Sequence, residues 1–171
     1  MKKKVTTPVV AGIVVSLILI VLNIVLYFTG AYLQKWTQYF GGAVMLGGII
    51  WAIVNHGNEK EHDVTFGNLF GFGFKVTAVI ICLTLLYTIL AGFLFPDIKQ
   101  KVMEMARQNA LSQPGVNEDQ AEKGMEMFEK NYTLFMVIGL IFWDLIVGVI
   151  ASLIGAAVGK KNPKSEFENQ L

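Results

Sequence analysis

The side chain best suited to chemistry is that of Asp144, the one Asp, Glu, Lys, Arg or His residue in the 27-residue apolar run Tyr132–Val158. Carboxyl groups within such runs are rare, usually face the interior of a helix bundle, and often mark functional sites. The residues that follow at helical spacing are all small: Gly148, Ser152, Gly155 and Gly159. Because these spacings place them on the same face of a helix as Asp144, we expect the carboxyl group to point into a bundle.

Two polar residues in other apolar runs reach the depth of Asp144. Counted at 1.5 Å per residue from the same end of each run, Asp144 lies ~21 Å deep, Asn23 ~22 Å and Thr88 ~20 Å. We therefore predict an intramembrane polar layer of Asp144, Asn23 and Thr88. Two interpretations stay open: the layer fixes helix register through hydrogen bonds, or Asp144 binds a proton, a cation or a basic group of a partner.

A second group of potential ligands has the spacing H-x-x-E-x-x-H-D and consists of His56, Glu59, His62 and Asp63. On a helix these positions drift around the cylinder, and Gly57 and Asn58 argue against a helix at this point. We interpret residues 55–65 as a polar loop and predict no metal site. The sequence also lacks a glycine-rich phosphate loop, a nucleophile triad and an HExxH motif, so it predicts no catalytic residue, no cofactor and no enzyme.

Composition places these residues in a membrane protein. The chain has 171 residues, of which 54% are apolar and 16% charged, against roughly 45–50% and about 25% in soluble domains. The apolar residues gather in four runs, which predicts an all-α integral membrane protein: one domain over residues 1–171 with spans at about 9–28, 39–55, 75–95 and 132–158. The net charge of +1 gives no reason to expect a nucleic-acid partner.

The longest water-soluble segment, residues 97–131, separates the third and fourth spans. Its apolar residues recur at helical spacing on both sides of a turn at Pro114, which predicts a helical hairpin inserted between the spans. Methionine adapts to varied partners, so we expect Met105, Met125 and Phe128 to form a docking surface. A polar tail is predicted over residues 160–171.

A second candidate docking surface precedes the third span. Phe66, Phe70 and Phe74 recur every four residues and would form one stripe on a helix. A single helix through this segment and the third span would be about 45 Å long, which exceeds the thickness of a bilayer. We therefore expect residues 66–74 to lie at the membrane interface, with a bend near Gly71 or Gly73.

The distribution of basic residues predicts the orientation. Eight lysines flank the spans on the side of the two termini, and six lysines or arginines flank them on the other side. The positive-inside rule then favours both termini in the cytoplasm.

The chain resembles an uncharacterised family of small bacterial inner-membrane proteins that is carried as a domain of unknown function. The resemblance rests on the TFGNLFGFGFK segment at 65–75, on the segment 96–131 with its EDQAE and MEM runs, and on a last span that is rich in small residues and ends in lysines. It implies four spans and a bacterial cytoplasmic membrane. It brings no activity, cofactor or catalytic residue.

The sequence therefore predicts a non-enzymatic integral membrane protein that acts as an accessory or interaction subunit of a larger assembly. Its partners would be the lipid bilayer and either other membrane subunits or further copies of itself. The alternative is a small oligomeric transporter or channel that uses Asp144 to couple to protons or cations.

Overall fold

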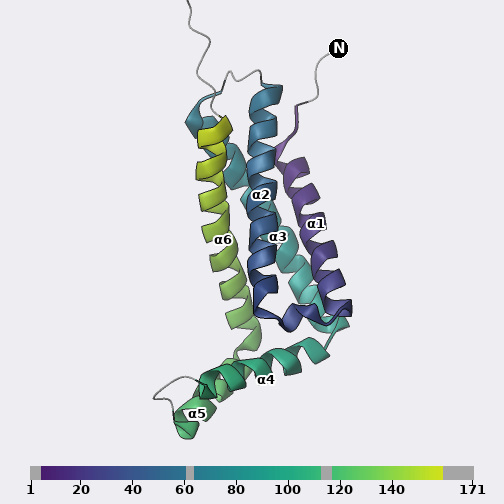
Figure 1. Ribbon diagram of the computed structural model, residues 1–171, viewed down its shortest axis with the longest axis vertical. Coiled ribbons are helices and arrows are strands. Elements are labelled where there is room, and N and C mark those ends of the chain that lie inside the picture. The colour runs from purple at the N-terminus through teal and green to yellow at the C-terminus, as the bar shows by residue number, and fades with distance from the viewer. Residues whose placement is uncertain (1–4, 61–63, 113–116, 160–171) are drawn as a thin grey trace, which may run out of the picture. The chain divides into compact units, whose positions relative to one another are not determined.

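The computed structural model describes residues 5–60, 64–112 and 117–159, and these residues form helices and connections with no strand. The elements, labelled in Figure 1, are α1 (Pro8–Phe28), the 3₁₀ turn η1 (Ala31–Leu33), α2 (Lys35–Glu59), α3 (Phe66–Leu94), α4 (Asp97–Leu111), α5 (Glu118–Lys130) and α6 (Tyr132–Gly159). The predicted all-α fold is confirmed. The predicted polar tail at 160–171 lies outside the described residues.

Local sequence explains several helix ends. Pro8 occupies the start of α1, where its missing N–H costs no hydrogen bond. The Thr7 side chain caps this helix by accepting a hydrogen bond from the backbone N–H of Val10 at 3.3 Å. Gly30 follows α1 with a φ of 71°, a left-handed conformation that favours glycine. Asn117 caps α5, because its side-chain oxygen accepts from the Gln120 N–H at 2.8 Å.

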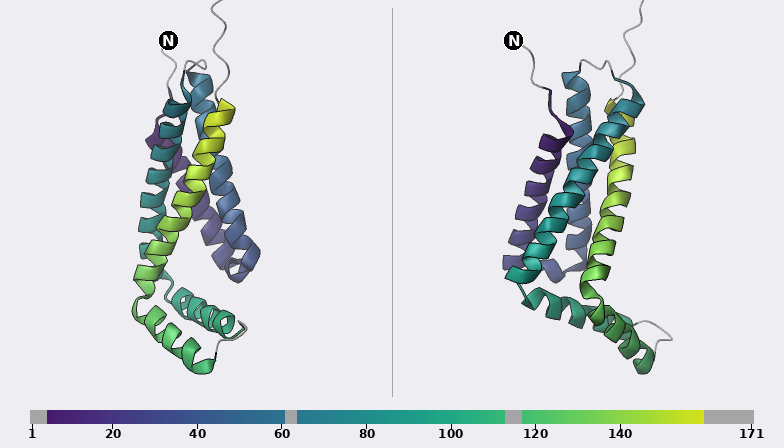
Figure 2. Two further views of the ribbon diagram at one scale, coloured as in Figure 1. Left: turned by 90° about the vertical axis from the view of Figure 1, so that its left-hand side faces the viewer. Right: turned by 180° about the vertical axis from the view of Figure 1, so that it is seen from behind.

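The chain divides into two compact units. Helices α3 and α6 each contribute one part to the first unit and one part to the second. The first unit contains Met1–Thr84 and Trp143–Leu171. In this unit α1, α2, the first part of α3 and the last part of α6 form a bundle with one continuous apolar core. Helices α1 and α3 begin, and α2 and α6 end, at the same end of the bundle, as Figures 1 and 2 show.

Small residues of α6 allow close helix packing in this bundle. A Cβ on Gly148 would lie 2.1 Å from Cγ2 of Thr77 in α3, and one on Gly155 would lie 2.6 Å from Cδ1 of Ile53 in α2. Opposite them, Gly73 of α3 packs against Ser152 of α6. The prediction that the small residues of α6 face inward is confirmed, because Gly148, Ser152, Gly155 and Gly159 are all buried.

The small residues of α2 divide between two faces. Gly48 packs against the Val15 side chain of α1, with a Cβ position 3.0 Å from it, and Ala52 is buried. Gly47 has nothing within 4 Å of its Cβ position, and Ala43 is exposed. Gly48 and Ala52, four residues apart, therefore face the bundle, whereas Ala43 and Gly47, also four apart, face outward.

Two helix boundaries differ from the sequence interpretation. Helix α2 continues through Glu59, so the predicted loop at 55–65 is wrong for its first five residues. Helix α3 starts at Phe66 and is continuous to Leu94, so it begins nine residues before the expected span. The contacts that stabilise the last turn of α2 are described below with the polar cluster.

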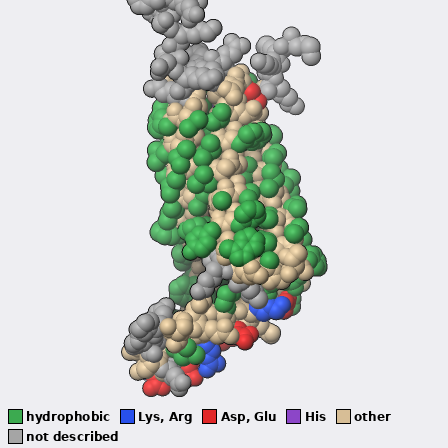
Figure 3. Space-filling view, in the orientation of Figure 1, with side chains coloured by type: hydrophobic (Ala, Val, Ile, Leu, Met, Phe, Trp, Pro, Cys, Tyr) green, Lys and Arg blue, Asp and Glu red, His purple; other side chains and the backbone are tan. Residues whose placement is uncertain are grey.

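Among the described residues, four helices are long and apolar enough to cross a membrane, and they lie at Pro8–Phe28, Tyr39–Glu59, Phe66–Leu94 and Tyr132–Gly159. Many large apolar side chains of these helices lie outside the core and are exposed, for example Leu17 and Val21 of α1 and Leu153 and Ile154 of α6. Figure 3 shows apolar side chains over the visible face of these helices. Such exposure is expected for a surface that faces lipid, since water disfavours large apolar patches.

The second unit, Leu85–Phe142, contains α4 and α5 together with the end of α3 and the start of α6. Helices α4 and α5 pack against each other. Arg107 of α4 and Glu122 of α5 form an ion pair at 3.4 Å, and Ala121 is buried. Within α4, Lys101 pairs with Asp97 at 2.9 Å.

Candidate functional site

Asp144 lies on α6, one turn before Gly148, and is half-buried. Its carboxylate oxygen Oδ2 is 3.2 Å from the hydroxyl oxygen Oγ1 of Thr84 on α3. The same hydroxyl lies 2.9 Å from the backbone oxygen of Ile80. A threonine hydroxyl has one proton to donate and two lone pairs that accept. Thr84 can therefore donate a hydrogen bond to the carboxylate, or donate to its own helix and accept a hydrogen bond from the carboxylic acid.

This arrangement gives the pair a defined chemical capacity. It can stabilise Asp144 in either protonation state without a change in side-chain position, because the hydroxyl serves as donor or acceptor. Such a pair can hold one proton or present one carboxylate oxygen to a cation. It can equally be a structural hydrogen bond between two helices.

The other two members of the predicted polar layer are residues of α1 and α3. Asn23 is an exposed residue of α1, and Thr88 follows Thr84 by one turn of α3 in the second unit. The hydrogen bond to Asp144 described here comes from Thr84, which the sequence interpretation did not single out. The layer of Asp144, Asn23 and Thr88 stays a prediction.

The packing of α3 against α6 defines a register between the two helices. The two helices run antiparallel, and Gly73 meets Ser152 while Thr77 meets Gly148. Each step of four residues forward along α3 thus corresponds to four residues backward along α6. Continued in this register, Asp144 falls opposite Ile81, and Thr84 follows Ile81 by one turn of α3.

Three further hydroxyl groups are fully buried in the bundle: Ser16, Thr77 and Ser152. Ser16 donates to the backbone oxygen of Gly12 at 2.7 Å, and Thr77 donates to that of Gly73 at 3.0 Å. Each hydroxyl thus donates its one hydrogen bond within its own helix. The Ser152 hydroxyl has no hydrogen-bond partner among the described residues. The Ser16 and Thr77 groups therefore act mainly as small packing residues.

A polar cluster closes the end of the bundle where α2 stops. The carboxylate of Glu59 accepts hydrogen bonds from the Thr6 backbone N–H at 2.6 Å, from the Thr6 hydroxyl at 2.6 Å and from the Asn55 amide at 2.8 Å. Nδ1 of His56 is 3.2 Å from the Thr6 carbonyl oxygen. Since a carbonyl only accepts, Nδ1 must carry a proton and donate it.

This cluster explains why the last turn of α2 is helical. The His56 ring stacks on Phe72 with centroids 4.0 Å apart, and Gly57 is buried against Gly159 and Leu69. Tertiary contacts therefore override the weak helix propensity of Gly57 and Asn58. The hydrogen bonds between Thr6 and the side chains of Glu59 and His56 also join the segment before α1 to the last turn of α2.

The cluster has no metal-binding geometry in the described part of the chain. No group of three His, Cys, Asp or Glu side chains there could hold a metal ion. His62 and Asp63, the other two residues of the H-x-x-E-x-x-H-D spacing, lie outside the described residues. His56 and Glu59 instead hold the N-terminal segment through Thr6.

The aromatic residues at the start of α3 form a ladder. Phe66 and Phe70 stack with centroids 6.4 Å apart and nearly parallel rings, and Phe70 and Phe74 repeat this spacing. Phe70 packs partly against the core, whereas Phe66 and Phe74 are 38% and 44% exposed. The predicted stripe is therefore present on a continuous helix.

The candidate docking residues of the second unit are less exposed than Phe66 and Phe74. Met105, Met125 and Phe128 are all half-buried. Phe128 packs edge-on against Tyr132 at 5.8 Å and also contacts Phe135 at 5.7 Å. Met127, which precedes Phe128, is the exposed methionine of α5.

Comparison with known proteins identifies a family for this helical arrangement. No curated protein and no solved structure matches the chain. The family described as "Protein of unknown function (DUF4199)" matches residues 11–161, which include all four long apolar helices apart from the first turn of α1. Because the match covers most of the sequence, the chain belongs to this family of unknown function.

Proposed function

We propose that the chain is a multi-pass protein of the bacterial inner membrane with both termini in the cytoplasm, and that it serves as a non-enzymatic accessory subunit of a larger membrane assembly. The four long apolar helices and their exposed apolar side chains support the membrane location. The excess of lysines on the side of the termini supports the orientation.

The observation that carries the interaction role is the position of the aromatic ladder on α3. This helix has 29 residues, so it is about 43 Å long, whereas the hydrocarbon core is about 30 Å thick. Residues 75–94 alone would fill that core, and Lys75 can extend its ammonium group to the interface. The ladder of Phe66, Phe70 and Phe74 would then project beyond the hydrocarbon.

Exposed aromatic rings outside the lipid favour contact with another protein. Aromatic residues are enriched at protein interfaces because they bury a large area with few rotatable bonds. The stacking of the three rings also fixes their positions before a partner binds, which lowers the entropic cost of association. Phe66 and Phe74 are therefore the residues that we expect a partner subunit or a second copy of the chain to contact.

Site-specific photo-crosslinking tests this function. A photoreactive phenylalanine analogue is placed at Phe74 and, as a matched control, at Phe142, which is exposed on the apolar part of α6. We expect a protein adduct at position 74 and lipid adducts at position 142. The adduct mass then distinguishes a second copy from another subunit. A monodisperse monomer in mild detergent, with lipid adducts at both positions, would contradict the proposal.

The contact between Asp144 and Thr84 supports one alternative function, an oligomeric transporter or channel coupled to protons or cations. The contact gives the carboxyl group a partner in both protonation states. Flux into proteoliposomes is compared between the wild type and Asp144→Asn. Loss of a wild-type flux in the variant would support the alternative, and equal flux or no flux in both proteins would eliminate it.

A further inference from the structure

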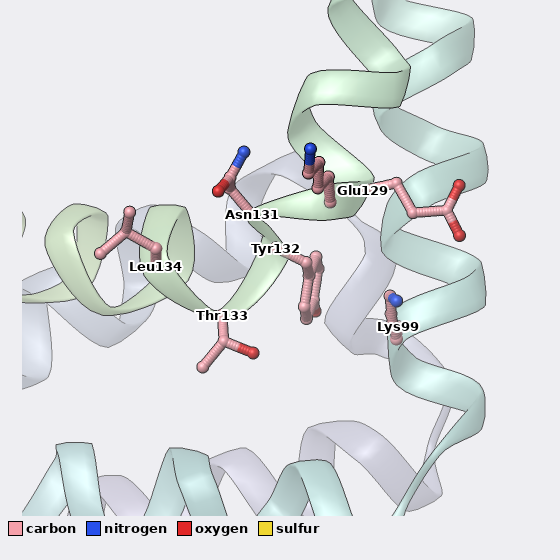
Figure 4. A pocket seen from close by; sticks show the side chains of 7 residues that line it. Lys99, Glu129, Asn131, Tyr132, Thr133 and Leu134 are labelled. Atoms are coloured by element: carbon pink, nitrogen blue, oxygen red, sulfur yellow. The ribbon is translucent and has the colours of Figure 1, made fainter.

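A pocket of about 380 Å³ lies within the second unit, where α5 meets α6. Its lining residues are Lys99, Glu129, Lys130, Asn131, Tyr132, Thr133 and Leu134. Figure 4 shows that Lys99 comes from a different helix than the other labelled residues, which belong to the α5–α6 junction. The volume is within the range of small-molecule sites. None of these residues takes part in the Asp144 pair or the aromatic ladder.

The side chains of this pocket suit a phosphate ester. Lys99 and Lys130 bring two positive charges and Glu129 one negative charge, so the lining is net cationic. Tyr132 and Thr133 add two hydroxyl groups that can donate hydrogen bonds, and the Asn131 amide, which donates one N–H to the Met127 backbone oxygen at 3.0 Å, has a second N–H. Lysine is a common phosphate ligand in proteins. The combination therefore favours a singly charged anion with several acceptor oxygens.

Contacts with its aromatic ring hold Tyr132, one of the lining residues, in place. The Lys99 ammonium group lies over the Tyr132 ring, 5.7 Å from its centroid. Phe128 packs against the same ring at 5.8 Å. Tyr132 thus contacts side chains of both α4 and α5, and the cation–π contact keeps the Lys99 ammonium group beside the ring.

An exposed apolar strip begins at the pocket and continues along α6. Leu134 lines the pocket, and Ile138 and Phe142 follow it at intervals of four residues, so the three share one side of the helix. They are 57%, 54% and 66% exposed. A ligand that fits both features has an anionic phosphate at one end and an apolar chain at the other.

We propose that this pocket binds the phosphodiester of an anionic phospholipid through Lys99 and Lys130, with the acyl chains along Leu134, Ile138 and Phe142. The inference rests on the proposed membrane location, because Tyr132 begins the apolar run of α6 and would lie at the headgroup level. A soluble phosphate ester shares the headgroup chemistry but cannot use the apolar strip. The strip therefore selects the lipid over the soluble ester.

Native mass spectrometry of the full-length protein in mild detergent tests the proposal. The probes are phosphatidylglycerol, zwitterionic phosphatidylcholine and soluble glycerol phosphate. The site variant is Lys99→Gln/Lys130→Gln. The control variant Lys101→Gln/Lys123→Gln removes two charges from α4 and α5 outside the pocket. A second site variant, Glu129→Gln, removes the negative charge of the lining.

We expect one phosphatidylglycerol to remain bound per wild-type chain. Each lysine near a headgroup is worth about a fivefold change in affinity, so the double site variant should bind roughly 25-fold more weakly. The control variant should bind within about twofold of the wild type. Glu129→Gln should bind more tightly, by up to about fivefold.

Three outcomes would overturn the lipid site: equal retention of phosphatidylcholine, equal loss in the control variant, or glycerol phosphate binding as tightly as the lipid. Flotation with vesicles separates this failure from failure of the proposed function. A protein that floats with vesicles but shows no lipid preference refutes only the site. A protein that does not float with vesicles of any composition refutes the membrane location itself.

Discussion

The methyl group of Thr77 occupies the space that a side chain at position 148 would need. A Cβ on Gly148 would lie 2.1 Å from Cγ2 and 2.5 Å from Oγ1 of Thr77, and Thr77 is completely buried. Neither atom can move far, because a β-branched side chain in a helix has few rotamers. Helices α3 and α6 therefore approach as closely as they do only because residue 148 is glycine.

Substitution of Gly148 should destabilise the bundle. We expect Gly148→Ala to lower the free energy of unfolding by about 1–3 kcal/mol, because the added methyl group forces the two helices apart. The measurement is thermal or denaturant unfolding in detergent, followed by helical circular dichroism. Gly139→Ala is the matched control on α6, since nothing lies within 4 Å of its Cβ position. A loss of stability at 139 as large as at 148 would contradict the packing argument.

The hydrogen bond between Thr84 and Asp144 can be measured as a coupling energy. A double-mutant cycle with Thr84→Val and Asp144→Leu should give about 0.6 kcal/mol and at most about 1.7 kcal/mol, the range found for hydrogen bonds between membrane helices. Unfolding in mixed detergent micelles supplies the four free energies. Additive effects of the two substitutions would show that the 3.2 Å contact contributes nothing to stability.

Removal of the Glu59 carboxylate should release the segment that enters α1. In Glu59→Ala the Thr6 N–H loses its acceptor at 2.6 Å, and a hydrogen bond to a charged group is worth about 1.5–3 kcal/mol. Because Glu59 is partly exposed, we expect the lower end of that range, which corresponds to roughly tenfold faster exchange of the Thr6 amide proton. Glu126→Ala, an exposed substitution on α5, serves as the control. Unchanged exchange at Thr6 would show that the segment is held in another way.

The proposed orientation predicts which positions a membrane-impermeant thiol reagent can reach. Cys82, the single native cysteine, is first replaced by alanine. Ser112→Cys, at the end of α4, should then be labelled in intact spheroplasts, and Thr65→Cys, just before α3, only after the cytoplasmic side is opened. The reverse pattern would place both termini outside the cytoplasm.

The fold was largely predictable because its strongest signals are local. Apolar runs about 20 residues long define the four long helices, and the small residues of the last run identified its buried face. The boundaries at Glu59 and Phe66 were not predictable in the same way. Gly57 and Asn58 favour a loop by propensity, and only contacts with Thr6, Phe72 and Gly159 make them helical.

The candidate site was predictable only in part, for a related reason. Asp144 stands out in the sequence because a carboxyl group in an apolar run is rare. Its neighbour depends on how α3 and α6 are aligned, and a depth estimate from one end of each helix cannot distinguish Thr84 from a residue one turn away. The pocket at the α5–α6 junction has no sequence motif, because Lys99 reaches it from about 30 residues earlier in the chain.

The position of α6 in the chain also determines when the core can be completed. Ile53 and Thr77, both completely buried, are covered by Gly155 and Gly148 of α6, which is synthesised after α2 and α3. Before the ribosome has produced these glycines, the core of α1, α2 and α3 lacks the residues that α6 contributes to it. Truncation before residue 148 would therefore remove the two glycines that cover Thr77 and Ile53 and leave this part of the core incomplete.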